Sequence, residues 1–252
     1  MFCVRCVSGA GTRLKNLEFM VLNVVVNMKF DKYDYEDYGA FKQANARLPN
    51  KYLYKSARMF GLKKRYLRFL KTADRNKSIL EIGCGNGEFL QEMMTDGFTD
   101  VRGIEPSPTY NLLVNPEYII QLDALSYFET CSYASIGTIV ALDVFEHIPF
   151  TELHTLLQLI YKCLMPGGTV IFRVPNMASV LALANYFGDL SHVTALNEKS
   201  IQQLIYDSGL VIKEIYPEPF AYPRSISTIL GILLWPFFKF ITASTMAAFG
   251  IH

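Results

Sequence analysis

The sequence lacks the features that mark several protein classes. Five cysteines in 252 residues, at positions 3, 6, 84, 131 and 163, are too few and too scattered for a disulfide framework. Only Cys3 and Cys6 have C-x-x-C spacing, and no second pair completes a zinc site, so we predict a reducing, cytoplasmic chain without a structural metal. An excess of positive charge is also missing, because 24 basic residues face 23 acidic ones. This balance gives no electrostatic sign of a nucleic-acid partner.

A membrane-spanning run of about 20 apolar residues is likewise absent. The most apolar stretch, Ile226 to Phe238, is interrupted by Pro236 and followed by Lys239. We interpret residues 224–252 as an apolar helical addition that contacts a membrane surface or a partner. A buried core helix is the alternative.

Two further segments precede the central part of the sequence. Residues 1–30 contain a short apolar run, Met20 to Val26, that lies too deep for a signal peptide. We predict that residues 1–30 are disordered or weakly structured, and an edge strand is the alternative. Residues 31–77 are aromatic and apolar with helical spacing, which predicts a helical cap. The basic side of Gly61 to Lys71 is expected to be a solvated face or to contact an anionic group.

The central part of the chain predicts an α/β fold. Short apolar runs without alternation are typical of parallel strands that are buried on both faces. They cover residues 78–82, 101–105, 118–123, 136–143, 169–174 and 210–216. Helical stretches lie between them, and Thr151 and Asn197 are the expected N-caps of two helices. We therefore predict a doubly wound, mostly parallel sheet over residues 78–223, with the helical cap before it and the apolar helical addition after it.

The first apolar run ends in three glycines, Gly83, Gly85 and Gly87. Glycines allow a tight turn and let a ligand approach the backbone at a helix N-terminus. Glu105 ends the next run and is placed to accept hydrogen bonds from both hydroxyls of a ribose. The third glycine comes one residue earlier than in the dehydrogenase fingerprint. The Glu81 carboxylate also suits a cationic sulfonium better than a pyrophosphate, so the loop favours S-adenosylmethionine over a nicotinamide cofactor.

Five motifs in order resemble those of class I, Rossmann-like S-adenosylmethionine-dependent methyltransferases. They are Glu81 to Gly87, Gly103 to Ser107, Leu122 to Ala124, Leu142 to Ile148 and Leu164 to Gly168. The resemblance implies roles for a set of cofactor-binding residues. Glu81, Gly83, Cys84, Gly85 and Gly87 would surround the methionine part, Glu105 and then Pro106 would lie at the ribose, Asp123 and Ala124 at adenine, and Asp143 and Val144 at the methyl-transfer end.

A narrower resemblance concerns the acceptor. Arg173 to Asn176 and Phe187 to Thr194 are similar to a bacterial branch that acts on cell-surface polysaccharide or other glycan precursors. In that branch the segment after the fifth strand helps to build the acceptor pocket. The resemblance implies O-methylation of a sugar hydroxyl on a glycan or lipid-linked saccharide. We expect this reaction at the cytoplasmic face of the membrane, with peripheral contact through residues 224–252.

The sequence departs from the family at the final strand. The family's sheet includes an antiparallel seventh strand, which is expected beyond the apolar segment. We expect either that Phe237 to Ala243 supplies a poor substitute or that the strand is missing. A missing strand would favour a third interpretation, in which the chain is a non-catalytic, methyltransferase-like module that binds a membrane or a partner.

Histidines are the candidate catalytic bases. His192 comes first, because a neutral imidazole accepts a proton near pH 7 and its segment should face the acceptor. His147 competes with it. Together with Asp143 and Glu146 it forms D-x-x-E-H, which resembles the metal-binding cluster of quinone-precursor O-methyltransferases. A metal-assisted enzyme acting on a quinone precursor or another small molecule is therefore the alternative function. We favour the interpretation without metal, in which Glu146 and His147 stabilise a helix start.

Overall fold

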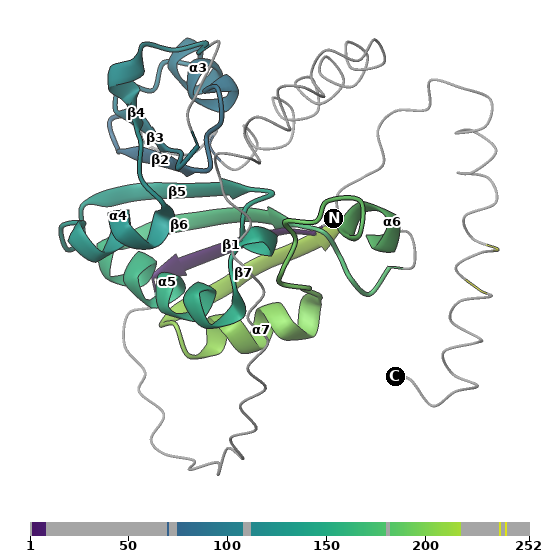
Figure 1. Cartoon of the computed structure of the whole chain (residues 1–252). Helices are drawn as coiled ribbons and strands as arrows, with labels where there is room; N and C mark the ends of the chain where they lie inside the picture. The colour runs from purple at the N-terminus through teal and green to yellow at the C-terminus, as the bar shows by residue number, and fades with distance from the viewer. Residues whose placement is uncertain are drawn as a thin grey trace, which may run out of the picture. The chain divides into compact units, whose positions relative to one another are not determined.

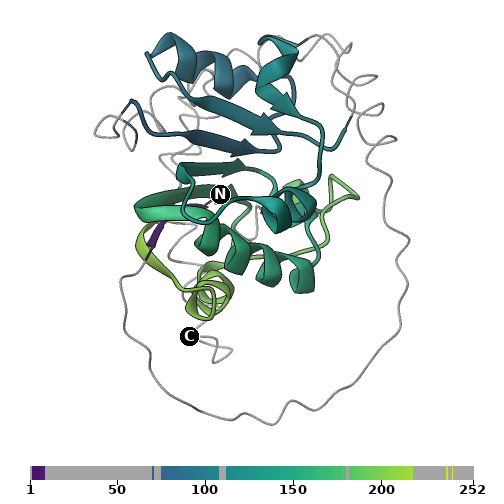
Figure 2. The same cartoon turned by 90° about the vertical axis from the view of Figure 1, so that its left-hand side faces the viewer.

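The computed structural model describes residues 2–8, 70, 75–107, 112–179, 182–217, 237 and 240. The chain divides into two units, Met1–Glu218 and Pro219–His252. The centre of the first unit is a seven-stranded sheet with helices packed on it (Figure 1 and Figure 2).

The sheet has the strand order β4-β3-β2-β5-β6-β1-β7. In chain order the strands are β1 (Phe2–Ser8), β2 (Ile79–Ile82), β3 (Val101–Ile104), β4 (Ile119–Ile120), β5 (Ile136–Leu142), β6 (Leu164–Val174) and β7 (Leu210–Pro217). The neighbours from β4 to β6 all pair in parallel, whereas β1 pairs antiparallel with β6 and with β7. The six predicted strands are confirmed, and the sheet is mixed and mostly parallel, as predicted.

Five α-helices and two short 3₁₀ helices are described between the strands. They are α3 (Glu88–Thr95), η1 (Pro116–Tyr118), α4 (Ala124–Thr130), η2 (Phe145–His147), α5 (Phe150–Cys163), α6 (Ala182–Tyr186) and α7 (Glu198–Tyr206). Asn197 caps α7 as predicted, in a capping box with Ser200. The predicted Thr151 cap is wrong, because α5 already begins at Phe150 and Pro149 occupies the N-cap position.

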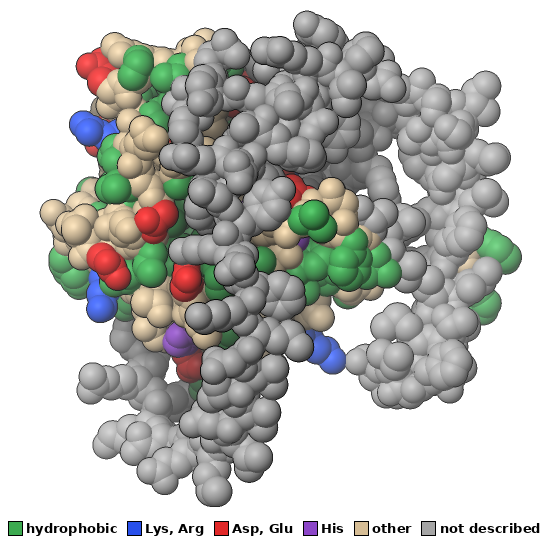
Figure 3. Space-filling view, viewed as in Figure 1, with side chains coloured by type: hydrophobic (Ala, Val, Ile, Leu, Met, Phe, Trp, Pro, Cys, Tyr) green, Lys and Arg blue, Asp and Glu red, His purple; other side chains and the backbone are tan. Residues whose placement is uncertain are grey.

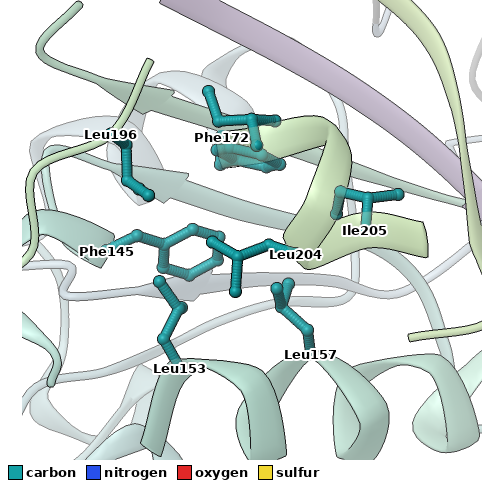
Figure 4. A pocket seen from close by; sticks show the side chains of 8 residues that line it. Phe145, Leu153, Leu157, Phe172, Leu196, Leu204 and Ile205 are labelled. Atoms are coloured by element: carbon teal, nitrogen blue, oxygen red, sulfur yellow. The ribbon is translucent and has the colours of Figure 1, made fainter. Parts of the chain in front are cut away.

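Alternate residues of the strands enter two hydrophobic clusters on opposite faces of the sheet. In β5, Ile139 packs in the cluster of α5 and α7, while Val140 packs in the cluster of α3. Between α5, α7 and the sheet, the side chains of Figure 4 converge, with the Phe145 and Phe172 rings 4.9 Å apart between centroids. They leave no volume that a water molecule could enter, so this region is packed core rather than a ligand site.

Strand β1 corrects two expectations from the sequence. Residues 2–8 are not disordered: they form a strand between β6 and β7, drawn in purple in Figure 1. Cys6 within it is fully buried. The antiparallel strand was expected beyond the apolar segment, but β1 at the N-terminus takes this place in the sheet. The seven-stranded sheet therefore needs no strand from residues 237–243. No local pattern marks this pairing, because the partners of β1 lie more than 150 residues away.

Other expectations fall outside the described residues. The helical cap is described only at Leu70 and from residue 75 onward, and the apolar addition only at Phe237 and Phe240, both helical and exposed. The basic side chains of residues 61–71 also lie outside the described residues, because only Leu70 of this segment is described. Within the described part of the chain, no helix combines the length and the apolar character that crossing a membrane requires.

Candidate active site

The predicted cofactor residues follow the carboxyl ends of neighbouring parallel strands. From β2 the sheet continues through β3 to β4 in one direction, and through β5 to β6 in the other. The connections therefore reverse direction between β2 and β5. In doubly wound sheets, ligands bind in the crevice outside the strand ends at such a reversal. The glycine loop follows β2 and the Asp143 turn follows β5, so both lie at this point.

The glycine loop has the backbone that its sequence predicts. Gly83, Gly85 and Gly87 all have positive φ, of 68°, 55° and 84°. Side chains at two of these positions would collide with neighbours, since a Cβ at Gly83 would lie 2.6 Å from Val144 Cγ2 and one at Gly87 would lie 2.7 Å from Val114 Cγ2. Among the described residues, a Cβ at Gly85 would meet only Glu88 Oε2, at 4.0 Å. With respect to these residues the backbone at Gly85 therefore borders open space, as a ligand lying against it requires.

Glu105 reaches back to this loop from the end of β3. The backbone N–H of Gly85 donates to its Oε2 at 3.0 Å, and the N–H of Ser107 donates to Oε1 at 3.0 Å. A carboxylate has about four acceptor positions, so each oxygen retains capacity for a ribose hydroxyl. The predicted juxtaposition of Glu105 with the glycine loop is thus present, and Pro106 follows it, half-buried.

Cys84 lies in the loop but turns its side chain into the core. Its Sγ packs against Gly103, where an added Cβ would lie 2.5 Å from the sulfur. Burial raises the pKa of the thiol far above its usual value, and the nearby Glu81 carboxylate adds to the effect. Cys84 therefore offers the cofactor only its backbone. Glu81, in β2, is itself buried.

The predicted adenine contacts lie at the start of α4. Asp123 caps this helix: its Oδ1 accepts from the Ser126 N–H at 2.9 Å and its Oδ2 from the Ser126 hydroxyl at 2.7 Å. Asp123 and Ala124 are both half-buried. The cap fixes the position of the Asp123 carboxylate, and contact with adenine remains a prediction.

Asp143 has a partner that was not predicted. Its carboxylate forms a bidentate ion pair with the buried guanidinium of Arg173. The guanidinium donates from Nε to Oδ1 at 2.7 Å and from an Nη atom to Oδ2. The backbone of Asp143 has a positive φ of 59°, and its N–H donates to the Arg173 carbonyl at 3.0 Å. Asp143 thus holds the turn that places Val144 against Gly83. The signal in the sequence was a charged residue inside a buried strand run.

The segment after β6 brings both candidate bases together. The rings of His147 and His192 lie 4.7 Å apart between centroids. The N–H groups of Val193 and Thr194 donate to the Glu146 carbonyl at 2.8 and 3.0 Å, which ties this segment to η2. His154 lies apart from them, within α5.

Each of these rings has a hydrogen bond at Nδ1. His192 Nδ1 lies 2.9 Å from the Tyr186 carbonyl oxygen, and His147 Nδ1 lies 2.8 Å from Ser191 Oγ. The Ser191 hydroxyl in turn donates to Asp189 Oδ1 at 2.5 Å. A carbonyl oxygen only accepts, so Nδ1 of His192 carries the proton and Nε2 of the neutral ring accepts. In the D-x-x-E-H alternative, Arg173 holds the Asp143 carboxylate, whereas Glu146 and His147 lie together with His192.

Comparison with known proteins agrees with this geometry. Residues 54–215 match the model of a family described as a methyltransferase domain. The chain belongs to this methyltransferase family. The chain therefore carries a methyltransferase domain, and the cofactor of this domain is S-adenosylmethionine. The glycine loop, the open space at Gly85 and the Glu105 carboxylate fit that cofactor.

Relatives of this methyltransferase are distant. A tRNA U34 carboxymethyltransferase of Shewanella frigidimarina is 44% identical over 36 residues, which is 14% of this chain and only 11% of that protein. Among solved structures, an S-adenosylmethionine-dependent methyltransferase from Archaeoglobus fulgidus is 21% identical with a TM-score of 0.51, covering 60% of this chain and 68% of that one. A possible histamine N-methyltransferase from Thermotoga maritima is 15% identical with a TM-score of 0.51, covering 73% and 95%. These structures share the fold.

Proposed function

We propose that the methyltransferase transfers the methyl group of S-adenosylmethionine to a hydroxyl of a glycan or lipid-linked saccharide. The support comes from the segment after β6, which lies next to η2 and carries exposed apolar side chains. They are Leu183, Phe187, Leu190 and Val193. Hydrophobic side chains gather over α6 in the space-filling view (Figure 3). Aromatic and aliphatic groups of this kind pack against the apolar faces of sugars and against lipid chains.

The observation that carries the proposal is the hydrogen bond from His192 to the Tyr186 carbonyl. It fixes the tautomer in which Nε2 of His192 is the proton acceptor. The acceptor oxygen attacks the methyl carbon as the carbon–sulfur bond breaks, and the hydroxyl proton passes to Nε2. A thiol or amine acceptor needs this base less, because it is the more nucleophilic group. A base held in this form therefore suits a sugar hydroxyl.

The cofactor supplies an activated methyl group on a sulfonium. The protein aligns the reacting groups and excludes water from them. Glu105 and the backbone at Gly85 hold the nucleoside in one orientation, which converts the transfer into a unimolecular step. The buried Asp143–Arg173 pair fixes the turn beside the glycine loop. Alignment of the attacking oxygen with the carbon–sulfur bond then sets the rate.

The test uses methyl-labelled S-adenosylmethionine and a cell-envelope extract. We expect label in the saccharide or lipid-linked saccharide fraction, with transfer reduced at least a hundredfold by His192→Ala. His154→Ala is the matched control and keeps full transfer. Label in RNA or in protein, or full transfer by His192→Ala, contradicts the proposal.

A further inference from the structure

Three metal-ligating side chains meet where the segment after β6 joins η2. Glu146, His147 and His192 each offer one ligand atom, and these atoms all lie within 4.8 Å of one another. Glu146 is buried and the two histidines are half-buried. Because the segments come from distant parts of the chain, the cluster is a product of the fold rather than of local spacing.

The hydrogen bonds at Nδ1 prepare both rings for a metal. Histidines that ligate metals almost always donate their other ring N–H to a carboxylate, carbonyl or similar acceptor, which fixes the tautomer and the ring orientation. For His192 this acceptor is the Tyr186 carbonyl oxygen. For His147 the acceptor is Ser191 Oγ, whose own proton is directed to Asp189. With Nδ1 of each ring engaged in this way, Nε2 is the nitrogen that would coordinate a metal.

We propose that Glu146, His147 and His192 form a binding site for a divalent transition metal, for which zinc is the best match. Two imidazoles and one carboxylate are a ligand set for zinc, with water in the remaining position. Zinc holds such ligands at about 2 Å, so the three atoms must approach to about 3.4 Å of one another. The three atoms lie within 4.8 Å of one another without a metal, so binding must draw them closer by up to about 1.4 Å.

Zinc at this site has a consequence for catalysis, which rests on the proposed function. The lone pair on Nε2 of His192 cannot coordinate a metal and accept a proton at the same time. Methyl transfer therefore proceeds in the presence of a chelator and is inhibited as zinc loads the site. Zinc is here an occupant that blocks the base, not a requirement of the reaction.

Binding is measured on the full-length protein by calorimetry with zinc, and by the visible absorption of cobalt(II), both without S-adenosylmethionine. We expect one metal per chain. His192→Ala and Glu146→Gln weaken binding at least tenfold, whereas His154→Ala leaves it unchanged. Ser191→Ala keeps all three ligands and removes only the support of His147, and it should weaken binding about tenfold. Thermal unfolding of each variant identifies any that does not fold, and Ser191→Ala then remains as the informative variant.

Failure of the site and failure of the proposed function are separable. Equal zinc binding by the wild type and His192→Ala overturns the site, whatever the methyl-transfer assay shows. Zinc that binds and leaves transfer unchanged or raises it overturns the competition with the base. Tight zinc binding together with inhibition that a chelator reverses supports both parts. Loss of methyl transfer in chelator alone counts against the proposed function and leaves the site intact.

Discussion

Arg173 holds the carboxylate of Asp143 from the neighbouring strand, through two hydrogen bonds between largely buried side chains. The pair joins the end of β5 to the end of β6. It fixes a turn of positive φ that sets Val144 against Gly83. A residue that the motif resemblance assigned to the methyl-transfer end is therefore also a fixed part of the scaffold of the site.

Removing the Arg173 side of this pair should destabilise the fold. Arg173→Met leaves the Asp143 carboxylate largely buried, with its side chain 19% exposed, and without its partner guanidinium. Breaking a buried pair from one side costs about 3 kcal/mol. The free energy of unfolding in urea measures this loss.

Arg102→Met is the matched control, because Arg102 is an exposed arginine on β3 and lies 3.9 Å from Asp100. It should change stability by no more than about 0.5 kcal/mol. Equal free energies of unfolding for the two variants would show that the Asp143–Arg173 pair does not stabilise the turn after β5.

Gly85→Ala should separate cofactor affinity from stability. The positive φ makes an L-residue costly by about 1 kcal/mol, and the new methyl group enters the space assigned to the cofactor. We expect S-adenosylmethionine to bind at least tenfold more weakly, as measured by calorimetry.

Gly167→Ala provides the comparison, because Gly167 also has a positive φ, 73°, and no described residue lies within 4 Å of an added Cβ. It should lose a similar amount of stability and keep its affinity. If both variants bind the cofactor equally, the space at Gly85 is not the cofactor site.

The N-terminal strand predicts a protected thiol at Cys6. Burial raises the pKa of the Cys6 thiol from 9.0 to about 12, so the group stays protonated at pH 8 in the folded protein. The thiolate is the reactive form, and we therefore expect very slow reaction with iodoacetamide. Mass spectrometry of the alkylated peptides measures this rate. Cys131, which is partly exposed, should react faster. Equal labelling of Cys6 in native buffer and in urea would mean that β1 does not occupy the sheet.

The parts of the fold that were predicted correctly have local signals. Buried parallel strands appear in the sequence as runs of apolar residues. The turn at Gly83 to Gly87 requires positive φ values, which glycine alone adopts freely. Asn197 was recognised as a cap because capping acts within three residues. These features are encoded within a few positions of one another.

The features that were missed depend on contacts between distant segments. The strand at residues 2–8 pairs with residues 169–174 and 210–217, and nothing near it in the sequence marks the partners. The approach of His192 to His147 depends on how the segment after β6 folds back onto η2. The partner of Asp143 was likewise 30 residues away, on the next strand.

The most direct test of this account is calorimetric titration of S-adenosylmethionine into the wild type, Glu105→Ala and the exposed control Glu129→Ala. Hydrogen bonds to a charged group contribute about 1.5–3 kcal/mol, so Glu105→Ala should bind at least tenfold more weakly, while Glu129→Ala binds like the wild type. Undiminished affinity in Glu105→Ala, or no binding by the wild type, would contradict the placement of the cofactor between Gly85 and Glu105.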